Sequence, residues 1–272
     1  MESTNTEYHR DIVCNEANMS MNKIRPTFVL VHGAWHSPAH FESLINSLTE
    51  HGYKAVAPNL PSMANAHISP STDCTEDART IRETILTELE SADVIIVPHS
   101  YGGIPTTSAL KGLDTLSRTA AGQHKTSVVA IAALTSFIIP AGTDMRQAEQ
   151  RPPLNAAEMP ATLDPPPLDI FFHELPDDEK EKWTAMLKPM ASAALVDKCH
   201  FSAHEVIPLH YLMAGADKAI PLETQERMVN TLRPTAVGEI RTDMVEGCGH
   251  APFLSRVEET VAFLRRTAGE TV

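Results

Sequence analysis

The sequence predicts an α/β fold in which a mostly parallel sheet is flanked by helices. Two observations support this prediction. Short, continuous apolar runs, typical of strands covered on both faces, alternate with longer segments whose apolar residues recur at helical spacing. Such alternation indicates crossover connections between parallel strands. The rhythm breaks between about residues 141 and 206, which indicates an insertion.

The first half of the chain supplies four predicted strands and three predicted helices. Strands are expected at Thr27–Val31, Lys54–Pro58, Asp93–Val97 and Ser127–Leu134. Helices are expected at Phe41–His51, from Thr75 to about Leu89, and at Gly103–Leu116. The second of these helices opens with acidic residues, which suit the helix dipole. The polar stretch Asn59–Asp73 before it is typical of a loop.

The second half resumes the pattern after the insertion. Strands are expected at Ile207–Ala214 and Glu239–Val245, and helices at Leu222–Leu232 and Val257–Arg265. Within the insertion, Arg151–Pro167 holds six prolines, which neither a helix nor a central strand tolerates, and Asp177–Leu195 has helical spacing. We interpret residues 141–206 as a cap, or lid, of helices and loops over the strand ends, where open sheets bind ligands. The core then comprises residues 26–140 and 207–272.

Charge and hydropathy exclude several kinds of partner. The formal net charge of −13 repels phosphate backbones and argues against nucleic-acid binding. No apolar run is long enough to span a bilayer, so no membrane association is expected. Residues 1–25 are polar and lack the apolar stretch of a signal peptide, so we expect a disordered leader there. These features predict a cytoplasmic protein that acts on a small molecule, and they leave open whether it forms a homodimer.

The four cysteines are expected to be free thiols. Cys14, Cys74, Cys199 and Cys248 form no CxxC pair, and their spacing suits no zinc site. Free thiols fit a reducing compartment. We therefore expect neither a metal nor a cofactor.

Ser100 is the candidate nucleophile. It follows the buried run Asp93–Val97 and precedes a predicted helix, within the sequence Pro98-His99-Ser100-Tyr101-Gly102-Gly103. A serine at such a sharp strand-to-helix turn stands above the sheet, and the free N–H groups of the helix face the developing oxyanion. Pro98 replaces the first glycine of the usual Gly-x-Ser-x-Gly pattern. The structural alternative is that Ser100 is only a helix N-cap.

His250 and Asp217 are the candidate base and its orienting acid. His250 lies in a glycine-rich loop directly after the last predicted strand, and Asp217 lies just past Ile207–Ala214. A carboxylate there can accept from the far nitrogen of the imidazole and fix its tautomer. Asp243 and Glu246 are rivals, but Asp243 falls inside a strand and Glu246 is too near His250. Taken alone, Asp217 reads as an ordinary turn aspartate.

Two backbone N–H groups are candidates for an oxyanion hole. One belongs to Tyr101, directly after Ser100, and the other to Ala34, in the turn His32-Gly33-Ala34 after the first strand. We expect the His32 side chain to brace that turn. Trp35 and Trp183 are weaker candidates for the substrate pocket; for both, packing is the alternative.

The chain resembles a known group of enzymes at several of these positions. Val31-His32-Gly33-Ala34-Trp35-His36 followed by Phe41 resembles the opening motif of the plant methylesterase and hydroxynitrile lyase group of α/β-hydrolases. Related bacterial and fungal hydrolases are similar over a longer stretch, about residues 27–265. Their resemblance includes the cap sequence Phe171-Phe172-His173-Glu174-Leu175-Pro176, Trp183, and Gly249-His250.

The resemblance implies an α/β-hydrolase fold, in which the triad occurs in the chain order Ser, Asp, His. Ser100, Asp217 and His250 would be that triad, with Ala34 and Tyr101 as oxyanion donors. Many fungal members act in secondary metabolism, which is a setting that the resemblance implies for this chain as well.

The sequence therefore predicts a serine hydrolase of small esters or lactones that works through an acyl-enzyme. One alternative is a lyase or cyclase that uses the same triad on a polyketide-like substrate without net hydrolysis. The lyases of the group have a threonine at the position of Gly33 and a lysine directly after the histidine, where this chain has Ala251. A non-catalytic binding protein is disfavoured because it would not need the complete triad.

Overall fold

The computed structural model describes residues 24–63, 72–123, 125–155, 158–166 and 168–272. Apart from Ile24 and Arg25, the leader expected at residues 1–25 lies outside these ranges. Among the described residues, no helix is long and apolar enough to cross a membrane.

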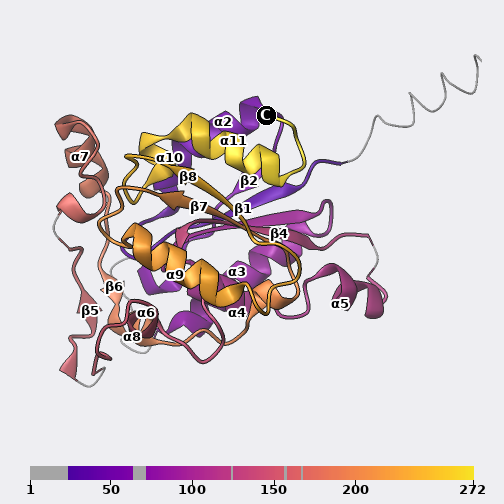
Figure 1. The fold of residues 1–272 in the computed structure, drawn as a ribbon, viewed down its shortest axis with the longest axis horizontal. Helices are drawn as coiled ribbons and strands as arrows, with labels where there is room; N and C mark the ends of the chain where they lie inside the picture. Colours follow the sequence, from indigo (N-terminus) through magenta and orange to yellow (C-terminus); the bar gives the residue numbers. More distant parts are fainter. Residues whose placement is uncertain (1–23, 64–71, 124, 156–157, 167) are drawn as a thin grey trace, which may run out of the picture.

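A six-stranded sheet forms the centre of the molecule (Figure 1). Its strands, in spatial order, are β2 (Ala55–Val56), β1 (Thr27–Val31), β3 (Val94–Ser100), β4 (Val128–Ser136), β7 (Leu209–Ala214) and β8 (Arg241–Val245). Every neighbouring pair is parallel. The predicted fold class is thereby confirmed, because each of the six predicted strands lies in this one sheet.

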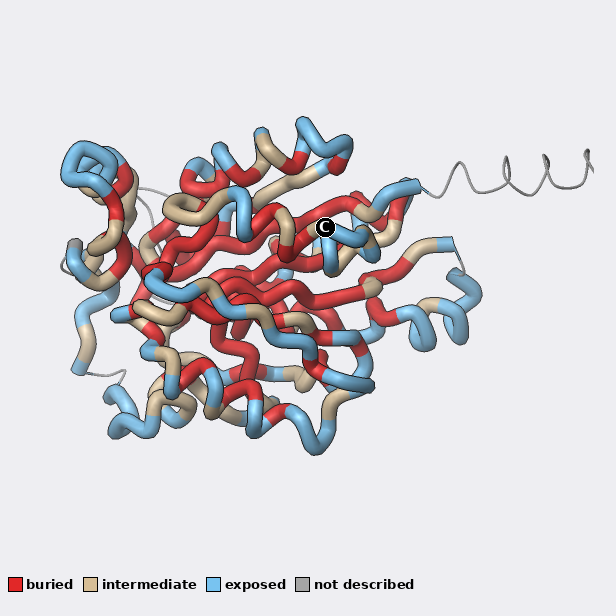
Figure 2. The backbone as a smooth tube through the Cα atoms, turned by 45° about the horizontal axis from the view of Figure 1, so that its top comes forward, coloured by how far each residue is buried: buried red, intermediate tan, exposed pale blue. Residues whose placement is uncertain are grey.

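Helices cover both faces of the sheet (Figure 1). One face carries α2 (Glu42–Glu50), α10 (Pro252–Ser255) and α11 (Val257–Thr267), and the other carries α3 (Cys74–Glu88), α4 (Gly103–Ala109) and α9 (Leu222–Leu232). The strands are buried between these layers, whereas the outer faces of the helices are exposed (Figure 2). The continuous apolar runs of the strands follow from this double cover.

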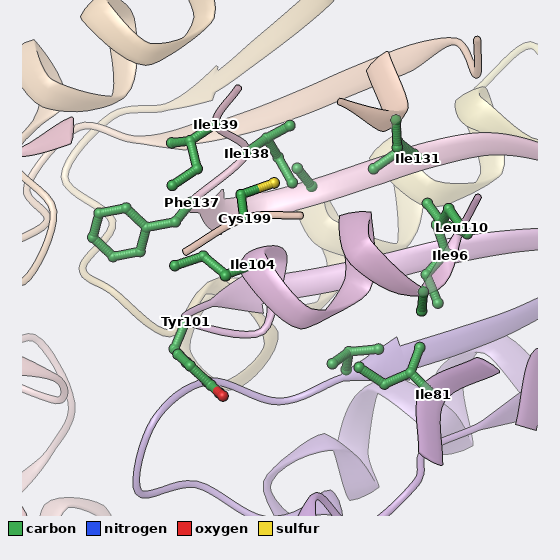
Figure 3. Packing of buried hydrophobic residues seen from close by; sticks show 14 of the residues in the cluster. Ile81, Ile96, Tyr101, Ile104, Leu110, Ile131, Phe137, Ile138, Ile139 and Cys199 are labelled. Carbon is green, nitrogen blue, oxygen red and sulfur yellow. The ribbon is translucent and has the colours of Figure 1, made fainter. Parts of the chain in front are cut away.

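The core is divided by the sheet into two clusters of buried residues. In the cluster drawn in Figure 3, Ile81 of α3 and Ile104 and Leu110 near α4 pack with the strand residues Ile96 and Ile131. All five are fully buried. This packing holds α3 and α4 against β3 and β4.

Two predicted helices are wrong because each is divided. The predicted helix Gly103–Leu116 ends as α4 at Ala109, and a separate α5 (Thr115–Ala120) follows. The Asp114 side chain caps α5 by accepting from the N–H of Ser117 at 2.9 Å. The capping aspartate starts a new helix where the apolar spacing alone predicts continuation.

The predicted helix Asp177–Leu195 divides into α7 (Asp177–Thr184) and α8 (Ser192–Val196). Pro189 lies between them and has no N–H to donate. The residues that follow it form β6 (Met190–Ala191), which pairs antiparallel with β5 (Thr162–Leu163). Pairing with β5, which comes from the proline-rich segment, therefore takes the place of a continuous helix at these residues.

Residues 141–206 supply the elements at one end of the sheet (Figure 1). They include α6 (Met145–Ala148), η4 (Leu168–Ile170) and the four elements of the preceding paragraph, whereas η5 (Ala203–Glu205) leads into the amino end of β7. The N–H of Lys188 donates to the carbonyl of Trp35 at 2.8 Å, which joins this segment to the turn after β1.

Candidate active site

Ser100 is the last residue of β3 and has a φ of +53°. This left-handed conformation is costly for a residue with a Cβ and is typical of functional turns. Directly after the turn, a Cβ on Gly103 would lie 2.4 Å from the carbonyl oxygen of Phe137, so only glycine fits. The turn therefore presses α4 against the end of β4 and raises Ser100 at the strand end.

The structure brings Ser100, Asp217 and His250 together in one chain of contacts. Nε2 of His250 lies 2.9 Å from Ser100 Oγ, and Nδ1 lies 2.8 Å from Oδ2 of Asp217. A carboxylate only accepts, so Nδ1 carries the proton and Nε2 is left to accept from the serine hydroxyl. The other Asp217 oxygen accepts from the N–H groups of Ala219 at 2.7 Å and Ile220 at 2.9 Å, which fixes the carboxylate.

The loop that carries His250 is held from two sides. The carbonyl of His250 accepts from Nε2 of His99 at 2.9 Å and from Oγ1 of Thr135 at 3.2 Å. Burial lowers the pKa of His99 well below its usual range, so this histidine is a neutral donor. The ring of Phe171 stacks on the imidazole of His250, with 5.5 Å between centroids. Ring stacking and backbone contacts together restrict the orientation of the imidazole.

Ala34 and Tyr101, the predicted oxyanion donors, both line the pocket that contains Ser100. Within the described part of the chain, neither backbone N–H has a hydrogen-bond acceptor. The Tyr101 hydroxyl points away, toward the core, and donates to Asp77 at 2.7 Å (Figure 3). Asp77 also accepts from the N–H and hydroxyl of Ser62, and burial raises its pKa to about 6. The tyrosine side chain thus anchors the residue that follows Ser100.

The turn after β1 is braced by His32, as expected. Its Nδ1 donates to the carbonyl of Gly33 at 3.1 Å, and its Nε2 accepts from the N–H of Leu60 at 3.3 Å. Trp35, two residues further along, has a φ of +63°. These two contacts hold the backbone just before Ala34.

The pocket around Ser100 has a volume of about 290 Å³. Trp35 lines it, as the sequence suggested, and its Nε1 donates to the carbonyl of Leu163 at 3.1 Å. Apolar side chains make most of the remaining wall, namely Phe137, Met145, Leu154, Pro166, Ile170, Phe171, Leu195, Ala219 and Ile220. Four charged residues also reach it: Arg146, Glu149, Arg151 and Lys218.

Trp183 does not line this pocket, which corrects the prediction that placed it there. Its side chain is 3% exposed and packs on the ring of His40, with 5.7 Å between centroids. The helical spacing around Trp183 indicates that its side chain is buried. Such spacing does not indicate which residues the side chain contacts.

The rival carboxylates lie elsewhere. Asp243 forms an ion pair with Arg266 at 2.7 Å on the surface, and Glu246 is exposed. Neither contacts His250, so the structure separates Asp217 from both rivals.

Sequence reasoning missed two groups of residues near the site. Lys218, Arg146 and Arg151 line the pocket, although only Lys218 has a sequence signal, since it directly follows Asp217. Glu174, from the segment 141–206, accepts from the N–H of Gly249 at 3.0 Å and so holds the loop of His250. Its position in the motif around Phe171 and Phe172 is the one signal that pointed toward it.

Three potential metal ligands meet outside this pocket, although the cysteine spacing had suggested no zinc site. Atoms of Cys74, Asp197 and His200 lie within 4.8 Å of one another. The thiol of Cys74 donates to the carbonyl of Lys198 at 3.6 Å, and burial raises its pKa. The group joins the start of α3 to the chain after α8, and none of its members lines the pocket around Ser100.

Comparisons with known proteins concern the family and the fold of the chain. A family model described as "Alpha/beta hydrolase family" matches residues 28–263. The chain is 29% identical over 259 residues to "Alpha/beta hydrolase nvfD" of Aspergillus novofumigatus, covering 92% of this chain and 99% of that protein. It is 26% identical over 258 residues to "Methylesterase 18" of Arabidopsis thaliana, covering 89% and 96%.

A solved structure of a pyrethroid hydrolase from Sphingobium faniae JZ-2 superposes with a TM-score of 0.67. The superposition covers 90% of this chain and 97% of that one, and the two sequences are 17% identical. At this identity, the likeness shows the fold alone. These matches confirm the resemblance to α/β-hydrolases of fungi and to plant methylesterases.

Proposed function

The chain belongs to the alpha/beta hydrolase family, and from that membership we propose that it cleaves a small-molecule carboxylic ester or lactone through an acyl-enzyme on Ser100. One observation carries the proposal. The hydroxyl of Ser100 lies 2.9 Å from an imidazole nitrogen whose partner nitrogen is held 2.8 Å from a buried carboxylate. This is the arrangement that converts serine into a nucleophile.

In the first half of the reaction, Nε2 of His250 takes the proton of Ser100 as Oγ attacks the carbonyl carbon. The buried carboxylate of Asp217 stabilises the imidazolium that forms. The oxyanion forms between the N–H groups of Ala34 and Tyr101, which line the same pocket. As the tetrahedral intermediate collapses, His250 returns its proton to the leaving alkoxide.

In the second half, His250 takes a proton from water, which attacks the acyl-enzyme. The acid leaves, and Ser100 regains its proton from the imidazolium. For a lactone, the alcohol released in the first half stays attached to the acyl chain. Hydrolysis then gives a single hydroxy acid.

We propose in addition that residues 141–206 act as a cap on this site. Arg146, Glu149, Phe171 and Leu195 of this segment line the pocket. Open α/β sheets bind ligands at the carboxyl ends of their strands, and an insertion that lines the pocket there is in the position expected of a cap. Amide hydrogen exchange would test it, since α7 peptides of a cap should exchange faster than those of β4.

From the resemblance to fungal hydrolases in the sequence, we propose a setting in fungal secondary metabolism together with a cytoplasmic location. The thiols of Cys74, Cys199 and Cys248 are free, as expected in a reducing compartment. Expression of a fluorescent fusion in a fungal host would test the location.

Lyase or cyclase chemistry is the second candidate, and one observation favours it. The lysine that such lyases carry after the histidine is replaced by Ala251, but Lys218 places a cation in the same pocket. Two observations favour hydrolysis instead. Ala34 and Tyr101 line the pocket, and their backbone N–H groups are the two donors that we propose for a tetrahedral oxyanion. A Cβ at position 33, where the lyases have threonine, would lie 2.8 Å from Cβ of Ser100.

Turnover in ¹⁸O-water separates these candidates. A panel of small methyl esters and lactones would be incubated with the wild type and with Ser100→Ala, and products would be read by mass spectrometry. Hydrolysis predicts one labelled oxygen in each acid product, and none without Ser100. A cyclised or cleaved carbon skeleton without label would show that the triad performs lyase or cyclase chemistry.

A further inference from the structure

The pocket around Ser100 is cationic although the chain as a whole is acidic. The formal net charge is −13, yet three basic residues line this pocket, Arg146, Arg151 and Lys218, against one acidic residue, Glu149. The overall composition of the chain therefore does not account for the positive charge of this pocket. Charge of one sign inside a concave, partly apolar site concentrates ligands of the opposite sign.

The two arginines share one carboxylate. Glu149 Oε2 lies 3.7 Å from Nη1 of Arg146 and 3.6 Å from Nη1 of Arg151. A single carboxylate neutralises one of the two guanidinium groups, so a net positive charge remains. Burial raises the pKa of Glu149, and the two arginines oppose that shift. Nε of Arg146 donates to the carbonyl of Pro152 at 3.0 Å, so that guanidinium is already oriented.

Lys218 supplies the third cation, from the segment between β7 and α9. Its backbone is fixed because Asp217 accepts from the N–H groups of the next two residues, at 2.7 and 2.9 Å. The lysine is exposed, and among the described residues it has no ion-pair partner. The ammonium group of Lys218 is therefore available to bind an anionic group of the substrate.

The rest of the wall is apolar, with Phe137, Leu154, Phe171 and Leu195. The volume of about 290 Å³ is near the lower end of the ~300–1,000 Å³ usual for small-molecule sites. We propose that the substrate is a compact ester or lactone with an apolar body and a carboxylate remote from the scissile carbonyl, bound by Arg146, Arg151 and Lys218. This rests on the proposed ester chemistry and names its substrate class.

Matched substrates test the proposal. Monomethyl esters of dicarboxylic acids from glutarate to suberate carry the remote carboxylate, and the corresponding dimethyl esters lack it. We expect the wild type to prefer the monomethyl ester by about tenfold or more in kcat/KM for at least one chain length, which is the size expected for a charge-assisted hydrogen bond. Arg151→Gln and Lys218→Gln should each lower this selectivity ratio, and their combination with Arg146→Gln should bring it to about one. Lys111→Gln, an exposed lysine that does not line the pocket, should leave the ratio unchanged.

A binding measurement separates failure of this proposal from failure of the ester chemistry. Octanoate and octanol would be titrated into Ser100→Ala by calorimetry, with and without the three charge substitutions. Octanoate should bind more tightly, and the substitutions should abolish its advantage. Equal binding of the two, or equal turnover of monomethyl and dimethyl esters, would overturn anion recognition while leaving ester hydrolysis intact. Octanoate binding that depends on the three cations, with no ester cleaved, would overturn the ester chemistry alone.

Discussion

Oε1 of Glu174 accepts a hydrogen bond from the backbone N–H of Gly249 at 3.0 Å. The contact joins the segment 141–206 to the residue directly before His250. Because the imidazole must meet Ser100 within hydrogen-bond distance, a carboxylate that fixes the neighbouring peptide also fixes the base. In the proposed mechanism, Glu174 is therefore a positioning residue that acts through the backbone of Gly249.

Glu174→Ala should lower kcat by about 10- to 100-fold with little change in KM, because small displacements of catalytic groups are costly while the pocket wall is kept. Glu174→Gln retains an acceptor oxygen and should recover most of kcat. Steady-state kinetics on one accepted ester checks both. Glu181→Ala, on the exposed side of α7, is the control and should match the wild type. Equal losses in the alanine and glutamine variants would contradict the positioning role.

Asp217→Asn should lower kcat by roughly three to four orders of magnitude, because an amide in place of the carboxylate favours the wrong imidazole tautomer. Asp243→Asn is the matched control. Its carboxylate binds Arg266 on the surface, so kcat should stay within about twofold of the wild type. If Asp217→Asn kept nearly normal activity while Asp243→Asn were inactive, Asp243 would be the acid that orients His250.

Much of this site was predictable because it depends on local pattern. Ser100 ends β3 and His250 lies in the loop after β8. Because the carboxyl ends of parallel strands meet at one edge of a sheet, these positions in the chain predict that the two residues lie close together. The cations were not predictable in the same way. Arg146 and Arg151 come from a segment whose path depends on Pro189 and on the pairing of β5 with β6, which apolar periodicity does not encode. The same limit explains why Trp183 was placed in the pocket. Its helical spacing indicates that it is buried, but not which residues surround it.

Gly33 should be intolerant of any side chain. A Cβ there would lie 2.8 Å from Cβ of Ser100 and 2.9 Å from Nδ1 of His99, and hydrogen bonds hold both residues. Gly33→Ala should therefore displace the nucleophile and lower kcat by about 100-fold, with a loss of about 1–3 kcal/mol in stability. Kinetics and urea unfolding measure the two effects. An alanine variant with normal kcat would show that the turn has more room than the geometry gives it.

Acid should destabilise the fold through His32. Burial lowers its pKa from 6.5 to about 4, with His40 and Lys188 adding to the effect, so the unfolded chain binds more protons than the folded one between those values. The stability that neutral His32 contributes is complete above about pH 6.5 and is lost as the pH falls toward 4. Between pH 7.5 and 5 this residue should account for about 2 kcal/mol of lost stability.

Urea unfolding at the two pH values tests this prediction. His32→Asn should show a pH-dependent loss about 2 kcal/mol smaller than that of the wild type. His51→Asn, at the exposed end of α2, should keep the wild-type loss. An unchanged pH dependence in His32→Asn would show that the titrating group lies elsewhere.

Covalent labelling by a fluorophosphonate tests the central claim, that Ser100 is a nucleophile activated by His250. The reagent requires an activated serine and is independent of which ester the enzyme prefers. Peptide mass spectrometry should find one adduct per chain on the peptide that contains Ser100 in the wild type. Labelling should be absent in Ser100→Ala and abolished in His250→Ala. An adduct on any other residue, or undiminished labelling of Ser100 without His250, would contradict the account.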